Sequence, residues 1–339
     1  MTDVTLITIA NQTGFSISTV SRVLSGKAKK YRIGEKTAKL IEEEAKKCHY
    51  TPSLLAKGLR MKESHTIGLL IPSLENYFFS MLASSAIKEA KLYDYTVVIV
   101  CTQENEMNEK DCLQQLISRR VDGIIAVPSG KNADDFEQIN EKVPILLVDR
   151  YFETSSLPYI CTNNYEGSLQ AMHYLIEHGH KNIACIQGPS FQTPVKERVR
   201  GYNDALKSAG LERYSNVVGE DFSIENGYLE TKLLLSYEER PTAILALSNT
   251  ILLGAIKAIN EEKLKISKDI SIISFDNNQF LDYLTPSITR VEQPIQGIGI
   301  LAVRTLIKRM KGVDENNDSH NSIQLMPKLI IGDSVKDLR

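Results

Sequence analysis

The sequence predicts an α/β protein with a small helical N-terminal domain and a larger body of two lobes, each built on a doubly wound parallel sheet. Over the first 50 residues the pattern is helical, with tight turns between the helices. From residue 66 onward, short apolar runs alternate with amphipathic helical stretches, and they are too numerous for one sheet. A chain of 339 residues is also long enough for two or three cores.

The pattern over residues 5–25 predicts two short helices joined by a tight turn. Thr5 can cap the first helix, Gly14 can end it in the left-handed conformation, and Ser16 can cap the second. Apolar residues recur at three- and four-residue steps on both helices, so the two helices should face each other. These residues are Leu6, Ile9, Ala10, Val20, Val23 and Leu24. A third helix is expected over about 35–47, with four inward side chains: Ala38, Leu40, Ile41 and Ala45.

The other side of the second helix carries small polar groups and one arginine. Such a face suits the major groove of DNA, where arginine can pair bidentately with guanine. An ordinary helical hairpin with capping serines is the alternative, and spacing alone supports it nearly as well. The candidate DNA contacts in this stretch are Thr5, Ser16, Ile17, Ser18, Thr19, Ser21 and Arg22.

Charge is distributed unevenly along the chain. Residues 1–62 hold twelve Lys and Arg against five Asp and Glu, about +7, although the whole chain carries −2. A basic segment that coincides with a helix-turn-helix pattern is what phosphate binding requires, whereas a solvated lysine surface is the plain alternative. The basic loop at 26–32 is expected to contact phosphates, with Lys29 as its candidate residue.

The body is expected to contain two similar layers of strands and helices. Expected strands lie at 67–71, 96–100, 123–127, 145–148, 183–187, 216–218, 242–247, 270–275, 323–326 and 328–331. Expected helices lie near 77–92, 106–119, 132–140, 165–178, 194–209, 225–236, 250–262 and 295–310. The tail can complete both lobes if the chain crosses between them near 161–163, 290–292 and 322. This is the architecture of periplasmic sugar-binding proteins, with two lobes hinged around a cleft.

These patterns define the expected domains. They are a headpiece at 1–50, a linker at 51–64, a first lobe at 65–161 with 291–322, and a second lobe at 162–290 with 323–339. Within the linker, Pro52 can start a short helix that would be marginal by itself in water.

Several function classes are disfavoured by the sequence. The cysteines at 48, 101, 112, 161 and 185 are scattered and lack metal-ligand spacing, so reduced thiols and no metal are expected. Phosphate-loop and nucleophile-elbow motifs are absent, so neither an enzyme nor a cofactor is expected. No apolar run is long enough to cross a bilayer, and the polar N-terminus is unlike a signal peptide. We therefore expect a cytoplasmic protein with no membrane partner.

The sequence reads Gly-Phe-Ser at residues 14–16 and Thr-Val-Ser-Arg-Val-Leu at residues 19–24. These two stretches resemble the headpiece of the lactose-repressor/galactose-repressor family of bacterial transcription regulators. The resemblance covers essentially the whole chain. It implies that residues 52–60 form a helix only against DNA, pair with their copy in a dimer, and insert Leu59 into the minor groove. A plain interdomain linker is the alternative. The chain departs from the family in a slightly longer basic loop and in Gly34, where a serine cap is common.

In such folds ligands bind beyond the carboxyl ends of the strands. The resemblance places Arg198, Phe222 and Asp276 at an effector, with Asp276 accepting hydrogen bonds from sugar hydroxyls or base nitrogens. Phe78 and Phe79 can stack on a ligand ring or begin a buried helix, and Asp149 can bind hydroxyls or cap a strand end. The full set of candidates is Asn76, Phe78, Phe79, Asp149, Gln192, Arg198, Phe222, Asn249 and Asp276.

A carbohydrate effector is the first expectation, since an arginine and carboxylates beside aromatic rings suit a neutral polyol. Ser248 and Asn249 stand where relatives of the family mostly have Asn-Asp, and the run Thr162-Asn163-Asn164 has Asn in place of a usual aspartate. Fewer carboxylates leave an acidic effector as the open alternative.

The function expected from these features is sequence-specific DNA-binding transcription regulation, most simply repression, controlled by a small effector in the cleft. The expected partners are double-stranded DNA with a two-fold operator, the effector, and a second copy of the chain. The C-terminal residues 332–339 show no leucine heptad of the kind that joins dimers into tetramers, so a homodimer is expected. The alternative is a sugar-binding protein without a DNA role.

Overall fold

The computed structural model describes residues 4–50, 63–312 and 322–339. The chain forms two compact units that divide between Ser64 and His65. The first unit is helical and the second is α/β. Most of the expected linker at 51–64, with Leu59, lies outside the described residues.

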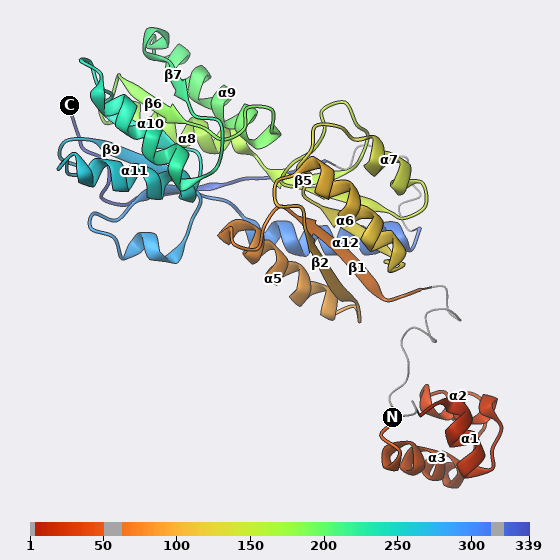
Figure 1. Cartoon of the computed structure of the whole chain (residues 1–339). Helices are drawn as coiled ribbons and strands as arrows, with labels where there is room; N and C mark the ends of the chain where they lie inside the picture. Colours follow the sequence, from red (N-terminus) through yellow and green to blue (C-terminus); the bar gives the residue numbers. More distant parts are fainter. Residues whose placement is uncertain (1–3, 51–62, 313–321) are drawn as a thin grey trace. The chain divides into compact units, whose positions relative to one another are not determined.

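The N-terminal unit packs α1 (Leu6–Thr13), α2 (Ile17–Leu24) and α3 (Glu35–Lys47) around a small core (Figure 1). Thr5 caps α1 by accepting the Thr8 N–H, and Gly14 ends the helix at a φ of 72°. The Ser16 hydroxyl accepts the Thr19 N–H at 3.2 Å and so begins α2. These caps confirm the helix-turn-helix that the sequence predicts.

The prediction that Leu40 belongs to the core of this unit is wrong. Leu40 is 49% exposed, whereas Ile41 and Ala45 are buried and Ala38 packs against them. Ala38, Ile41 and Ala45 follow the three- and four-residue steps of one helix face. Leu40 is one residue before Ile41, so it is turned about 100° away from that face.

The first lobe of the α/β unit is a parallel sheet in the order β11-β5-β4-β3-β1-β2. Its strands are β1 (Thr66–Ile71), β2 (Thr96–Cys101), β3 (Gly123–Ala126), β4 (Ile145–Val148), β5 (Tyr159–Thr162) and β11 (Ile323–Leu325). One face packs on α5 (Tyr77–Lys91) and α12 (Ile295–Met310), the other on α6 (Glu106–Ser118) and α7 (Asp134–Asn140).

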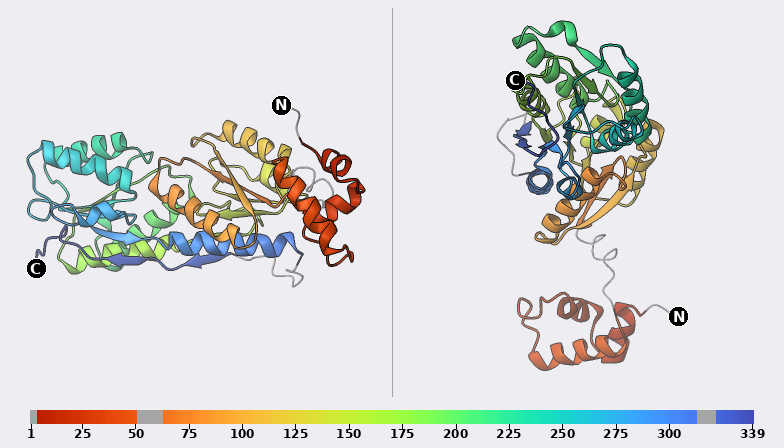
Figure 2. Two further views of the ribbon diagram at one scale, coloured as in Figure 1. Left: turned by 90° about the horizontal axis from the view of Figure 1, so that it is seen from below. Right: turned by 90° about the vertical axis from the view of Figure 1, so that its left-hand side faces the viewer.

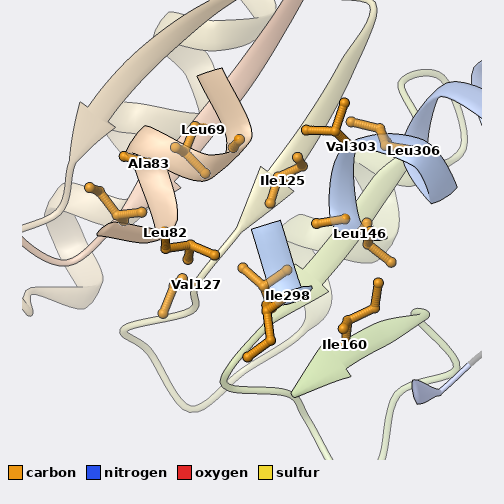
Figure 3. Packing of buried hydrophobic residues seen from close by; sticks show 14 of the residues in the cluster. Leu69, Leu82, Ala83, Ile125, Val127, Leu146, Ile160, Ile298, Val303 and Leu306 are labelled. Carbon is orange, nitrogen blue, oxygen red and sulfur yellow. The ribbon is translucent and has the colours of Figure 1, made fainter. Parts of the chain in front are cut away.

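Alternation along the strands builds the two cores of this lobe. Ile125 and Leu146 point toward α5 and α12, among the side chains that Figure 3 shows. Their neighbours Ile124 and Ile145 point to the opposite face, toward α6 and α7. This explains why both strands are continuous apolar runs.

The second lobe repeats this winding in the order β12-β10-β9-β8-β6-β7, with β12 antiparallel to β10 and the other neighbours parallel. Its strands are β6 (Ile183–Ile186), β7 (Asn216–Val218), β8 (Ala243–Ala246), β9 (Ser271–Phe275), β10 (Thr289–Glu292) and β12 (Lys328–Ile330). The helices α8 (Asn164–Glu177) and α9 (Thr193–Ser208) cover one face, and α10 (Ile224–Ser236) and α11 (Asn249–Glu261) cover the other. Short 3₁₀ turns lie at η1 (Glu212–Tyr214) and η2 (Gln279–Asp282).

The connections between the lobes differ in part from the expectation. The first follows β5 at Thr162, as predicted, and β5 itself was not predicted. The predicted crossing at 290–292 is wrong because β10 extends to Glu292 within the second sheet. The crossing predicted near 322 is wrong because β11 pairs with β5, so the chain changes lobes between β11 and β12. Figures 1 and 2 show α12, in blue, lying among the orange and yellow elements of the first lobe.

Within the described residues, every helix is too short or too polar to span a bilayer. The same residues contain no cluster of three or more histidine, cysteine, aspartate or glutamate side chains placed to hold a metal ion.

Candidate functional site

A pocket lies between the two lobes, beside the carboxyl ends of their strands. It encloses about 380 Å³ free of protein atoms, part of it open to solvent. Its lining residues are Asn76, Phe78, Phe79, Asp149, Arg150, Gln192, Pro194, Arg198, Phe222, Ser248, Asp276 and Gln293. All the sequence-predicted effector residues except Asn249 are in this set. Arg150, Pro194, Ser248 and Gln293 join them without having been predicted.

Aromatic rings enter the pocket from both lobes. Asn76 begins α5 by accepting the Phe78 N–H at 2.9 Å, and this places Phe78 and Phe79 in the lining. Their rings meet edge to face with centroids 5.2 Å apart. On the other lobe Phe222 lies against Gly188, where a Cβ atom would come within 2.5 Å of the ring. Gly188 therefore leaves the space that Phe222 occupies.

Arg198 is buried and held from three sides. Its Nε donates to Asn164 Oδ1 at 2.8 Å and its Nη1 to the Leu247 carbonyl at 2.7 Å, while its guanidinium lies 4.0 Å from the centroid of Phe275. Both acceptors are uncharged, so neither neutralises the cation. Burial lowers the pKa of Arg198, and the nearby carboxylates of Asp276 and Asp149 oppose this by favouring the charged guanidinium.

Arg150 is the buried cation of the first lobe. Its two terminal nitrogens donate to the Glu104 carboxylate at 2.6 and 2.8 Å, and Nη1 also donates to the Pro128 carbonyl at 3.2 Å. Glu104 and the preceding Gln103 both have positive φ, 55° for Glu104 and 57° for Gln103. This tight turn carries the carboxylate to Arg150, and the pair is charge-neutral.

Two buried carboxylates complete the polar lining. Burial raises the pKa of Asp149 to about 6, against the opposing effect of Arg150 and Arg198. Burial also raises the pKa of Asp276, which Arg198 opposes. Gln293 donates to Asp276 and accepts the Thr162 hydroxyl at 2.7 Å, so it connects the carboxylate to the end of β5.

Two amide oxygens near this lining are buried without a hydrogen-bond partner, Gln192 Oε1 and Asn249 Oδ1. Gln192 lines the pocket at the start of α9, and Asn249 lies in the first turn of α11 directly after the lining residue Ser248. An unpaired buried acceptor is unfavourable, so a hydroxyl donor that enters the pocket would be stabilised there.

A network of side chains supports Asp276 and Gln293 from behind. Buried Arg290 donates to Asn277 Oδ1 at 2.8 Å and to Asp282 Oδ1 at 2.7 Å. Asn277 in turn donates to Glu292 Oε1 at 2.6 Å. Asn277 and Glu292 are the chain neighbours of Asp276 and Gln293. The network therefore fixes both pocket residues through the backbone.

The raised pKa of Asp149 gives a pH-dependence of stability. The unfolded carboxyl has the ordinary pKa of 3.8, so the folded carboxyl binds its proton more tightly than the unfolded one. The contribution of Asp149 to the free energy of unfolding therefore declines as the pH rises from about 4 to about 6. The decline is about 3 kcal/mol by linkage. We expect Asp149→Asn, which stays neutral, to lack it. Urea unfolding of both proteins between pH 4 and 7 checks this. A constant difference in unfolding free energy across that range would contradict the assignment.

Of the headpiece residues predicted to contact DNA, Ser16 to Thr19 begin α2, Arg22 lies in its last turn, and Lys29 lies in the loop that follows. Ile17, Ser18 and Arg22 are exposed, Ile17 to 48%. The Ser16 hydroxyl lies 2.9 Å from those of Ser18 and Thr19. Thr5 is also exposed, and its hydroxyl lies within hydrogen-bond distance, 3.2 Å, of the Thr8 hydroxyl in the cap of α1. Ser21 is half-buried and Lys29 is exposed.

A helix-turn-helix unit followed by a two-lobed receptor with a polar pocket defines a class of ligand-controlled DNA-binding regulators. Comparison with known proteins agrees with this class. A model described as a periplasmic binding protein-like domain matches residues 172–335. The ribose operon repressor of Halalkalibacterium halodurans is 34% identical over 307 residues, which cover 91% of this chain and 90% of that protein. The HTH-type transcriptional repressor PurR of Actinobacillus pleuropneumoniae serotype 3 is 31% identical over 336 residues, 98% of this chain and 99% of the relative.

The fold also matches a solved structure over nearly the whole chain. The lac repressor dimer bound to operator and the anti-inducer ONPF superposes with a TM-score of 0.88 at 24% identity, covering 98% of this chain and 99% of that one. The chain belongs to the lactose-repressor/galactose-repressor family of bacterial transcription regulators. The family resemblance of the sequence is thereby confirmed.

Proposed function

We propose that this regulator is a dimeric, sequence-specific repressor whose DNA affinity is set by a neutral sugar bound between the lobes. The observation that carries the proposal is the pairing of a built polar pocket with an exposed recognition face on α2. The pocket holds aromatic rings, two guanidinium groups and two carboxylates. The family acts on bacterial DNA, so we place the protein in the cytoplasm.

The charges in the pocket favour a neutral effector over an acidic one. Arg150 is already paired with Glu104, and Arg198 faces Asp149 and Asp276. An anion would meet two carboxylates and no uncompensated cation. A sugar hydroxyl, in contrast, can donate to a carboxylate and accept from a guanidinium, and the aromatic rings can cover an apolar ring face. Since one relative is named a ribose operon repressor, we propose an aldopentose such as D-ribose.

A thermal-shift screen of the full chain tests this effector class. At a concentration near one hundred times its Kd, D-ribose is expected to raise the melting temperature by about 5 °C or more. Ribonate and ribose 5-phosphate serve as matched acidic probes and should raise it less, because their anions face the same carboxylates. A larger shift with an acidic probe than with any neutral sugar would contradict the proposed class.

Contacts across the pocket edge can link ligand binding to lobe movement. Lys196 of the second lobe pairs with Glu153 of the first at 2.6 Å, and the Tyr151 N–H donates to Thr193 Oγ1 at 3.2 Å. Opening of the pocket would break both contacts. We propose that the effector favours one lobe arrangement, by about 1–3 kcal/mol, and that the linker at 51–64 with Leu59 transmits this to the headpieces.

We propose that a second copy of the chain covers exposed apolar surface on both lobes. Ile87 on α5 is 44% exposed beside the half-buried edge strand β2. On the second lobe, Leu229 and Leu233 on α10 are 55% and 49% exposed, and Leu253 on α11 is 37% exposed. Burial of these side chains in an interface would be favourable, and a two-fold dimer would match a two-fold operator.

DNA selection tests the regulatory role. The full chain is mixed with a pool of genomic fragments, and bound duplexes are measured by fluorescence anisotropy at fixed salt. The proposal predicts a set of two-fold sites bound at least about 1000-fold more tightly than bulk DNA. Binding that depends on charge alone, together with a normal sugar response, would instead support a sugar-binding protein without a DNA role.

A further inference from the structure

The basic loop of the headpiece has a defined conformation. The Lys27 N–H donates to the Arg22 carbonyl at 2.9 Å, and the Tyr31 N–H donates to the Lys27 carbonyl at 3.2 Å. Ala28 and Ile33 pack against the headpiece core, and the Ile33 N–H donates to the Ala28 carbonyl at 3.0 Å. Two apolar anchors and these backbone bonds fix where the loop places Tyr31.

That position is over Arg22. The guanidinium carbon of Arg22 lies 4.1 Å from the centroid of the Tyr31 ring, and the ring is 45% exposed. The cation therefore lies over the ring and makes a cation–π contact with it. This contact uses the charge of the guanidinium and accepts no N–H hydrogen bond in the way a carboxylate would, so the fork of donors that a guanine edge requires is not spent on an ion pair with Tyr31.

We infer that Tyr31 is a positioning residue that holds Arg22 ready for base recognition. The inference rests on the proposed function, because it needs α2 to enter the major groove. A free arginine side chain loses much rotational freedom when it forms a bidentate contact. The contact with the Tyr31 ring restricts that freedom before DNA binds, so the side chain loses less freedom on binding.

The neighbours of Tyr31 favour positioning over direct base contact. Lys29, Lys30 and Arg32 surround it in the sequence and are exposed. Side chains of this kind contact phosphates. The loop would therefore lie along the DNA backbone, with the ring between the phosphates and the arginine that reads the base.

Full-length variants and one selected operator test the inference. Two duplexes are compared: the operator, and a variant in which the guanine contacted by Arg22 is replaced by another base. The quantity measured is the ratio of the affinity for the operator to the affinity for the variant. Tyr31→Leu is expected to lower this ratio about two- to five-fold, the size of an exposed cation–π contact. Tyr31→Phe keeps the ring and should retain the ratio. In an Arg22→Ala background, Tyr31→Leu should have no further effect.

Lys30→Ala is the matched control in the same loop, and it should weaken both duplexes equally. The inference is overturned if Tyr31→Leu leaves the ratio unchanged, or if Tyr31→Phe lowers it as much as Tyr31→Leu. It is also overturned if Tyr31→Leu lowers the ratio equally with and without Arg22. Circular dichroism of each variant shows whether the helices are retained. A wild-type chain with no preferred duplex would overturn the proposed function itself, which is a different result.

Discussion

Replacement of Arg198 by alanine is expected to abolish the effector response while operator binding persists. Arg198 lines the pocket, and its two hydrogen-bond acceptors within the protein are uncharged. Each charge-assisted hydrogen bond to a ligand is worth about 1.5–3 kcal/mol, so loss of the arginine should weaken sugar binding by about 10- to 150-fold for each such bond. The headpiece is a separate compact unit and keeps its recognition face. Isothermal titration with sugar and anisotropy with operator measure the two properties separately.

Arg200→Ala is the matched control on the same helix. The Arg200 side chain is 58% exposed, pairs with Glu197 and lies over the Tyr165 ring, outside the pocket lining. It should leave sugar affinity unchanged. Arg198→Lys keeps the charge but cannot reproduce the fork that meets Asn164 and Leu247, so it should recover little affinity. An Arg198→Ala protein that binds sugar with wild-type affinity would remove this residue from the site.

Replacement of Arg22 by alanine is expected to reduce discrimination between operator sequences. A bidentate arginine–guanine contact is worth about 1–3 kcal/mol. Arg22→Ala should therefore remove about that much preference for guanine at the base pair that Arg22 contacts, and leave the preferences at other base pairs nearly unchanged. Measured affinities for a set of single-base operator variants locate the loss. The exposed position of Arg22 on α2 makes a large effect on folding unexpected.

Lys29→Ala is the comparison for that experiment. Its contact is expected to be with a phosphate, so it should weaken all duplexes about equally and lower the slope of log affinity against log salt by about one. Equal salt slopes and unchanged specificity in both variants would contradict the groove assignment of α2.

The fold was predictable where the signals are local. The caps at Thr5 and Ser16 and the glycine at 14 specify the headpiece helices from a few neighbouring residues. Strands such as β4 are recognisable because both of their faces are buried, so the whole run is apolar. Elements that depend on distant partners were missed. β10 carries the buried Arg290, whose partners Asn277 and Asp282 lie before the strand, Asp282 in η2, and the pattern of β10 is therefore not apolar.

The candidate site shows the same division. Residues that follow strand ends, such as Asp149 and Asp276, were predictable because parallel strands gather their carboxyl ends at one edge. Arg150 was missed because its partner Glu104 lies 46 residues away in the sequence. Gln293 was missed because it follows β10, which the apolar pattern did not show.

In the proposed function, one chain recognises DNA through α2 and is controlled through the pocket. The decisive measurement is a titration of D-ribose, or whichever neutral sugar stabilises the protein, into the full chain bound to its selected operator. We expect operator affinity to change at least about five-fold and to saturate over the sugar concentrations that raise the melting temperature, as linkage requires. Operator affinity that stays constant while the pocket becomes saturated with sugar would contradict it.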